Sequence, residues 1–352
     1  MGSAGGVNGG GGTAGRGALW LLALGGALLI FWNLGAHDLW PPDEPRFAEV
    51  AREMSQRGDP TLLWLNDRLY TDKPPLFFWA INAFGALHGR IDEWAARMPS
   101  AVATFLALWL ILRLGTRMYD RRTGLLGAFV FLTSVQIAIR ARWASIDMTL
   151  NLFVLAAILL LWEGGESAGS EQTRRGRLAV LGAWGCMGLA TLAKGPVGLV
   201  LPLLAVGSTL GLQRRWQSLR FIAPVSGMLL YLVVVMAWFG PFAARLGLSE
   251  ALAVTTHQTV ERYVDAWNAQ HPVWYYLWRF PAGFFPWIML LPWGIAQALG
   301  EGRKDAARRR SSIFLLVWMA SIFLFFSFST GKRGVYIIPL YPAAAILVGR
   351  LL

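Results

Sequence analysis

The chain has 352 residues, of which 55% are hydrophobic and only 15% are charged, and its mean hydropathy is +0.47. A soluble domain carries about 25% charged residues, so this composition excludes an ordinary soluble protein and indicates one whose solvent is the lipid bilayer. The net charge of +12 does not indicate nucleic-acid binding, because the basic residues are spread over short links between apolar runs.

The N-terminal residues 1–17 are rich in glycine and almost free of apolar side chains, which is typical of a disordered tail. The apolar run Ala18–Leu34 follows and is long enough to cross a bilayer. It lacks a small-x-small cleavage signal, so we interpret it as a signal anchor. The single Cys186 excludes an intrachain disulfide.

Further apolar runs have the length that a helix needs to cross about 30 Å of hydrocarbon. With the first run, they lie near residues 18–35, 95–115, 124–140, 146–162, 178–193, 196–212, 221–243, 279–299, 312–328 and 335–352. The sequence therefore predicts an all-α integral membrane protein with about ten spans.

Basic residues occupy alternate links between these runs, and an excess of Lys and Arg marks cytoplasmic loops. The four links contain Arg113, Arg117, Arg121 and Arg122; Arg174, Arg175 and Arg177; Arg214, Arg215 and Arg220; and Arg303, Lys304, Arg308, Arg309 and Arg310. We expect these links to be cytoplasmic. A first external loop, 36–94, and a second large one, 244–278, then lie on the opposite face.

The first external loop contains its own helical pattern. Phe47, Val50, Ala51 and Met54 repeat at helical spacing, which predicts an amphipathic helix lying on the membrane surface. The apolar stretch 76–87 is too short to span and predicts a second interfacial helix.

Acidic residues stand next to apolar runs on the external side, where charge is costly and is usually functional or paired. Asp43 and Glu44 follow the first run, and Asp43 is either a helix N-cap or a general base that accepts a proton from an attacking hydroxyl. Asp147 begins a later run, close to Arg140 and Arg142. It is an N-cap, a partner in a buried salt bridge, or part of a site.

Several cations share this external side. Lys73 precedes two prolines at the interface, and it either snorkels beside Asp72 or holds a phosphate. Further basic residues at external helix ends are Lys194, Lys332 and Arg333. Together these charges predict an anion-binding face.

The second large loop combines His257, Arg262 and Tyr275 with further aromatic residues. No cofactor is required by the sequence. A divalent metal held by Asp72 and His257 is an alternative interpretation, but one carboxylate and one imidazole are too few to name a metal.

The motifs, in their order along the chain, resemble the bacterial polyprenyl-phosphate-sugar transferases. That family includes the aminoarabinose transferase of lipid A and, more distantly, the protein O-mannosyltransferases. The similarity extends from Asp38 to about Pro342. Its most specific elements are Asp43-Glu44-Pro45-Arg46-Phe47-Ala48-Glu49, Asp72-Lys73-Pro74-Pro75-Leu76, Ser145-Ile146-Asp147-Met148, Ala193-Lys194-Gly195-Pro196 and Gly331-Lys332-Arg333-Gly334-Val335-Tyr336.

The resemblance implies a C-type glycosyltransferase fold and an inverting transfer in which Asp43 activates the acceptor and Asp147 occupies a second acidic position. The residues implied to hold the donor phosphate are Lys73, Arg142, Lys194, Lys332, Arg333 and Tyr336. We place Glu44, Arg46, Arg262 and Tyr275 in the substrate-binding set as well. The family often has Glu where this chain has Asp72.

The implied function is sugar transfer from a polyprenyl-phosphate donor to a hydroxyl or phosphate of a lipid A-like lipid or a protein. It would occur at the periplasmic or outer face of a bacterial inner membrane. Residues 18–352 form the expected transmembrane domain, and we expect the C-terminal part of the family to be missing. A multi-span transporter or lipid flippase is the main alternative, and a scaffold without activity is a third.

Overall fold

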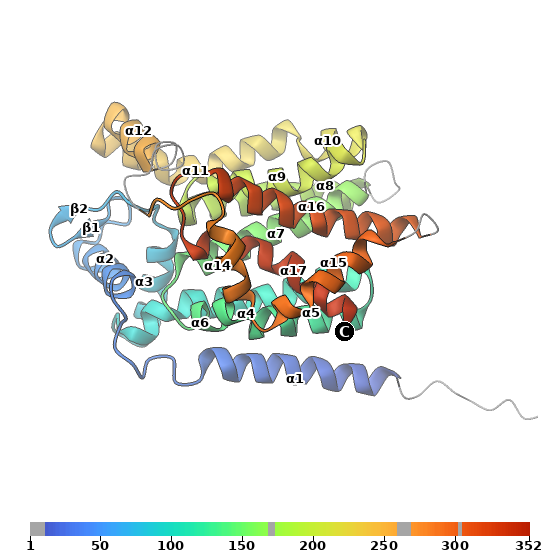
Figure 1. Cartoon of the computed structure of the whole chain (residues 1–352). Helices are drawn as coiled ribbons and strands as arrows, with labels where there is room; N and C mark the ends of the chain where they lie inside the picture. The colour runs from blue at the N-terminus through green and yellow to red at the C-terminus, as the bar shows by residue number, and fades with distance from the viewer. Residues whose placement is uncertain (1–10, 168–172, 259–268, 302–304) are drawn as a thin grey trace, which may run out of the picture.

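The computed structural model describes residues 11–167, 173–258, 269–301 and 305–352 (Figure 1). The regular elements of the described chain are helices and one two-stranded antiparallel hairpin, β1 (Trp64–Leu65) and β2 (Arg68–Leu69), and an isolated bridge pairs Gln270 with Gly331. The helices are α1 (Gly11–Phe31), α2 (Asp43–Arg57), α3 (Leu76–His88), α4 (Glu93–Met118), α5 (Arg121–Thr133), α6 (Val135–Arg140), α7 (Ile146–Glu166), α8 (Thr173–Lys194), α9 (Val197–Leu212), α10 (Trp216–Ile222), α11 (Val225–Leu246), α12 (Leu248–Thr256), α14 (Tyr275–Phe284), α15 (Leu291–Leu299), α16 (Ala306–Phe328) and α17 (Tyr341–Leu351), with 3₁₀ helices η2 (Trp287–Met289) and η3 (Gly334–Leu340).

Long apolar helices form a bundle, and the hairpin, α2 and α3 gather at one end of it (Figure 1). Six helices among the described residues are long and apolar enough to cross a membrane, or seven if one bent pair counts as a single span. The six are 93–118, 146–166, 174–194, 216–246, 306–328 and 334–351. The all-α membrane architecture is thus confirmed, whereas the count of ten spans is not.

The other apolar runs are interrupted or short. The run 124–140 breaks at Ser134, whose ψ of 131° is extended and separates α5 from α6. The run 279–299 bends by 114° between Phe284 and Trp287, because Pro286 has no backbone N–H to continue the helix and disfavours helical geometry at Phe285. The remaining two form the shorter apolar helices 17–31 and 197–212. Helix α1 begins at Gly11, within the tail expected to be disordered, and residues 1–10 lie outside the described residues.

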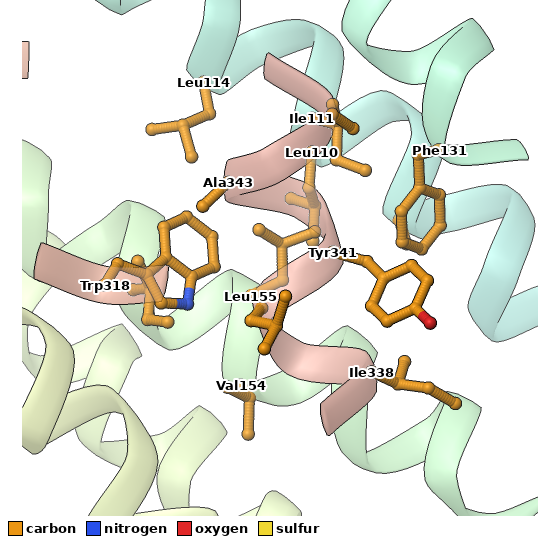
Figure 2. Close-up of a cluster of buried hydrophobic side chains, with 14 of the residues drawn as sticks. Leu110, Ile111, Leu114, Phe131, Val154, Leu155, Trp318, Ile338, Tyr341 and Ala343 are labelled. Atoms are coloured by element: carbon orange, nitrogen blue, oxygen red, sulfur yellow. The ribbon is translucent and has the colours of Figure 1, made fainter. Parts of the chain in front are cut away.

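The centre of the bundle is packed by aromatic and branched side chains (Figure 2). Trp318 of α16 and Tyr341 of α17 lie among residues of α4, α5 and α7, and neither exposes more than 1% of its surface. The buried indole N–H of Trp318 donates to the carbonyl of Pro339 at 3.0 Å, so its burial leaves no unsatisfied donor. This core fixes the helices whose ends form the site.

Helix α2 has the predicted amphipathic pattern, and its apolar face packs on protein. Phe47 makes edge-to-face contacts with Phe77 and Phe78 of α3, with ring centroids 5.7 and 5.9 Å apart. Val50 and Ala51 are fully buried in the same small core. The first turn of α2 is therefore held rigidly against the bundle.

The two ends of the bundle differ in charge pattern. At one end, the basic links contact the C-terminal part of α7, where Arg113 donates to Glu163 at 2.8 and 3.0 Å and Arg215 pairs with Glu166. Asp147 lies at the other end of α7, about 28 Å away at 1.5 Å per residue. The basic links and the predicted site are thus separated by about the thickness of the hydrocarbon core.

Candidate active site

A cavity of about 990 Å³ lies at the end of the bundle that carries α2 and the β1–β2 hairpin. Its described lining contains seven Lys or Arg side chains against three carboxylates. The basic residues are Arg46, Lys73, Arg140, Lys194, Arg279, Lys332 and Arg333, and the acidic residues are Asp43, Asp72 and Asp147. This excess of positive charge favours an anionic ligand.

Asp43 begins α2 and faces the cavity. It does not cap the helix, because the N-cap is Pro42 and no side-chain capping bond forms. Instead one carboxylate oxygen accepts from Arg46 at 2.5 Å, and the other lies 3.8 Å from Arg333. The side chain keeps 34% of its surface exposed, so a substrate hydroxyl can reach it. The geometry fits the general-base interpretation better than the N-cap.

Glu44 points the other way and is 1% exposed. Its carboxylate accepts from Arg97 Nε at 3.0 Å and Nη2 at 2.9 Å, from the amide of Trp40 at 2.8 Å and from the amide of Ala144 at 2.6 Å. Arg97 also donates to three carbonyls, those of Leu34, His37 and Asp38. Glu44 is absent from the cavity lining, so its expected substrate-binding role is replaced by a structural one.

Asp147 lies in the first turn of α7 and forms an ion pair with Lys194 at the end of α8. The N-cap is Ser145, so the salt-bridge interpretation of Asp147 fits the structure and the N-cap interpretation does not. The Lys194 ammonium also lies 4.4 Å from the ring centroid of Tyr336, in cation–π geometry. All three predicted residues line the cavity.

Lys73 and Asp72 lie on the link between β2 and α3. The Lys73 ammonium donates to the backbone carbonyl of Asp72 at 2.9 Å, and the Asp72 carboxylate accepts from Gln258 at 3.1 Å. His257, next to Gln258, lines the same cavity. The described ranges contain no group of three or more His, Cys, Asp or Glu residues suited to a metal, so the metal stays a prediction.

The segment between α16 and η3 brings Lys332 and Arg333 into the cavity. The Lys332 ammonium donates to the carbonyls of His271, at 2.9 Å, and Ser329. The residue is 2% exposed, and this burial lowers the pKa of Lys332. Predicted Tyr275 also lines the cavity, with its ring stacked on His271 at 4.3 Å.

Two arginines in the cavity were missed from the sequence, and one was assigned wrongly. Arg142 does not line the cavity and donates instead to the carbonyl of Leu29 in α1 at 2.8 Å. Arg140, two positions earlier, and Arg279 on α14 do line it. The signal for Arg279 was a lone charge at the start of an apolar run. Predicted Arg262 lies outside the described residues.

Part of the cavity lining is apolar. Helix α11 contributes Val235, Trp238 and Phe239, and α16 contributes Phe325 and Phe326. The exposed surface of α11 is also apolar, and only 11% of its most apolar stretch is buried inside the protein. A ligand with an anionic head and a hydrocarbon tail would match both the basic and the apolar parts of this lining.

Comparison with known proteins finds similar sequences and similar structures. The family model described as dolichyl-phosphate-mannose-protein mannosyltransferase matches residues 72–239. The undecaprenyl phosphate-alpha-4-amino-4-deoxy-L-arabinose arabinosyl transferase of Pectobacterium atrosepticum is 32% identical over 92% of this chain and 56% of its own length. The protein of the same name from Enterobacter sp. is 28% identical over 94% of this chain and 58% of its own.

Solved structures of known proteins are also similar to this chain. ArnT from Cupriavidus metallidurans, bound to undecaprenyl phosphate, superposes with a TM-score of 0.85 at 28% identity, over 95% of this chain and 60% of that one. The oligosaccharyltransferase of Archaeoglobus fulgidus shares the fold, with a TM-score of 0.67 at 14% identity over 96% of this chain and 49% of its own. The chain thus spans less than two thirds of the length of these proteins. The predicted membrane fold is confirmed.

Proposed function

We propose that this chain, which is related to the polyprenyl-phosphate-sugar glycosyltransferases and carries their C-type fold, transfers a sugar from a polyprenyl-phosphate-linked donor to a lipid or protein acceptor. One observation carries the proposal: a single cavity combines seven basic side chains with an apolar wall on α11 and α16. A sugar phosphate joined to a long isoprenoid matches both parts of this cavity, because its phosphate is anionic and its isoprenoid chain is apolar. The neighbour bound to undecaprenyl phosphate supports an undecaprenyl carrier.

The chemistry follows from Asp43 and the surrounding cations. Asp43 accepts the proton of an acceptor hydroxyl as the oxygen attacks the anomeric carbon from the side opposite the phosphate. The bond from that carbon to the phosphate oxygen breaks, and the polyprenyl phosphate leaves with the electron pair. An acceptor phosphate oxygen, already ionised, attacks in the same way without losing a proton. Each path inverts the anomeric centre.

Cations stabilise the leaving group as negative charge builds on the phosphate. Lys73, Lys332, Arg333 and Arg46 line the cavity near Asp43 or on the neighbouring links. Lys194 is paired with Asp147, so it contributes less free charge and positions Tyr336 beneath it. No covalent enzyme intermediate is needed.

We propose that the reaction occurs at the periplasmic or outer face of a bacterial inner membrane. The four basic links are the expected cytoplasmic side, and those that contact Glu163 and Glu166 lie at the far end of α7 from Asp147. The hydrophobic tail of the donor would then enter from the bilayer beside α11.

Mass spectrometry of lipids and glycoproteins from cells with and without the gene tests the proposal. We expect one glycolipid or glycoprotein to lose a sugar residue when the gene is absent and to regain it on complementation. Identical profiles, with transport of a lipid or sugar across sealed vesicles, would support a transporter instead.

A further inference from the structure

Arg279 is a cavity cation that no carboxylate among the described residues neutralises. It lies on α14, is half-buried and lines the cavity. In the part of the chain that the structure describes, its buried Nε has no hydrogen-bond partner and no carboxylate lies within salt-bridge distance. By contrast, Arg46 and Arg333 contact Asp43, and Lys194 pairs with Asp147. A buried donor of a charged group without a partner is costly, which points to a ligand atom.

Gly334 makes room for this arginine. A Cβ at position 334 would lie 2.5 Å from Nε and 3.1 Å from Cγ of Arg279. The arginine side chain therefore runs directly across the Gly334 backbone. Gly334 is not among the glycines with positive φ, so close approach, and not backbone conformation, is the reason for glycine here.

Arg140 shares the situation of Arg279. Helices α6 and α14 pack together, and the amide of Val135 donates to the carbonyl of Phe285 at 3.1 Å. The charges of Asp147, Asp43 and Arg279 act on Arg140, yet no carboxylate lies at salt-bridge distance from it among the described residues. Its guanidinium lies 4.9 Å from the ring centroid of Trp143. Two guanidinium groups that are close enough to influence each other repel, and an anion bound by both relieves this repulsion.

We propose that Arg279, together with Arg140, binds phosphate oxygens of the substrate, and that Gly334 is the position that admits Arg279 to the cavity. This assignment rests on the proposed function. The guanidinium fork matches the geometry of a phosphate, which an ammonium does not. The phosphate belongs either to the polyprenyl donor or to a phosphorylated acceptor lipid, and the two sources are separable by experiment.

The test measures binding of matched lipids to the full chain in nanodiscs. Undecaprenyl phosphate is compared with undecaprenol, and diphosphorylated lipid A with its dephosphorylated form. Wild type is compared with Arg279→Gln, Arg140→Gln and Gly334→Ala, and with Arg90→Gln, an exposed arginine outside the cavity, as control. Thermal unfolding of each variant verifies that it is folded.

We expect Arg279→Gln to weaken one phosphorylated lipid about 10- to 100-fold, corresponding to the loss of hydrogen bonds to a charged group, and to leave its phosphate-free partner unchanged. A loss of affinity for undecaprenyl phosphate would show that Arg279 binds the donor phosphate, and a loss of affinity for lipid A would show that it binds the acceptor phosphate. Gly334→Ala should reproduce the loss although the charge remains, and Arg279→Lys should restore only part of the affinity.

Two failures have different meanings. If wild type prefers phosphorylated lipids but Arg279→Gln binds them equally well, the inference is overturned and the proposed function stands. If wild type itself binds undecaprenyl phosphate no better than undecaprenol, the proposed function fails, and the inference with it.

Discussion

Asp43 and Glu44 are adjacent in the sequence, and the structure gives them opposite environments. The Asp43 side chain is 34% exposed in the cavity between two arginines, whereas the Glu44 side chain is 2% exposed and accepts four hydrogen bonds from the protein. Successive helical side chains point about 100° apart, so one helix start supplies both a reactive group and its anchor. A charged residue near a membrane is therefore either part of a reactive site or part of a structural ion pair, and its burial and hydrogen-bond partners distinguish the two.

The largest expected effect is on Asp43. We expect Asp43→Asn to lower the rate of sugar transfer by about 10²- to 10⁴-fold, the usual contribution of a general base, while the free energy of unfolding stays within about 0.5 kcal/mol. Transfer assays on purified protein and thermal unfolding measure the two quantities. Asp67→Asn, with 92% of its side chain exposed outside the cavity, is the matched control. Full activity in Asp43→Asn would remove Asp43 from the mechanism.

Glu44 and Arg97 should show the reverse pattern. Removing one partner of a buried ion pair leaves the other charge uncompensated and costs about 3–5 kcal/mol, so Glu44→Gln and Arg97→Met should unfold at clearly lower temperatures. A double-mutant cycle should give a strong coupling between them, because they share two hydrogen bonds. Donor binding by the protein that remains folded should be preserved. Unchanged stability with lost donor binding would return Glu44 to the substrate-binding set.

Because of Lys332, donor binding should weaken as the pH becomes alkaline. Burial lowers its pKa from the ordinary 10.5, so its ammonium loses the proton at a lower pH than an exposed lysine does. Undecaprenyl phosphate should bind fully below the lowered pKa and lose roughly tenfold in affinity as pH rises through it. Lys332→Arg, which stays charged, should not show this decline. A wild-type affinity that is flat through this range would mean that Lys332 does not contact phosphate.

The smallest effect is expected at Arg142. Its guanidinium contacts the Leu29 carbonyl of α1 outside the cavity, so Arg142→Gln should change transfer less than twofold and stability by at most about 1 kcal/mol. Arg140→Gln is the informative partner, since it removes the same group two residues earlier. Equal losses of transfer in both variants would show that activity depends on the positive charge of this segment and not on the placement of Arg140 in the cavity.

Sequence patterns predicted what depends on local periodicity. The apolar runs predicted α4, α7, α8 and α16, and the spacing of Phe47, Val50 and Met54 predicted α2. Motif order predicted most of the cavity, including Asp43, Lys73 and Arg333.

The features that the sequence did not reveal depend on where helices bend and on which way side chains point. The break at Ser134 and the bend at Pro286 turned expected spans into shorter helices, because a few backbone dihedrals outweigh an apolar run. Whether Arg140 or Arg142 faces the cavity depends on where α6 ends. The burial of Glu44 required Arg97, which lies 53 positions away in the sequence.

We propose that this cavity transfers a sugar with inversion of the anomeric centre. The direct measurement is incubation of the purified full chain with an α-linked polyprenyl-phosphate sugar and a candidate acceptor, followed by nuclear magnetic resonance of the anomeric proton in the product. Inversion should give a β-linked product and stoichiometric release of polyprenyl phosphate. An α-linked product, or movement of the donor across a sealed bilayer without any new covalent bond, would show that the cavity does not carry out an inverting transfer.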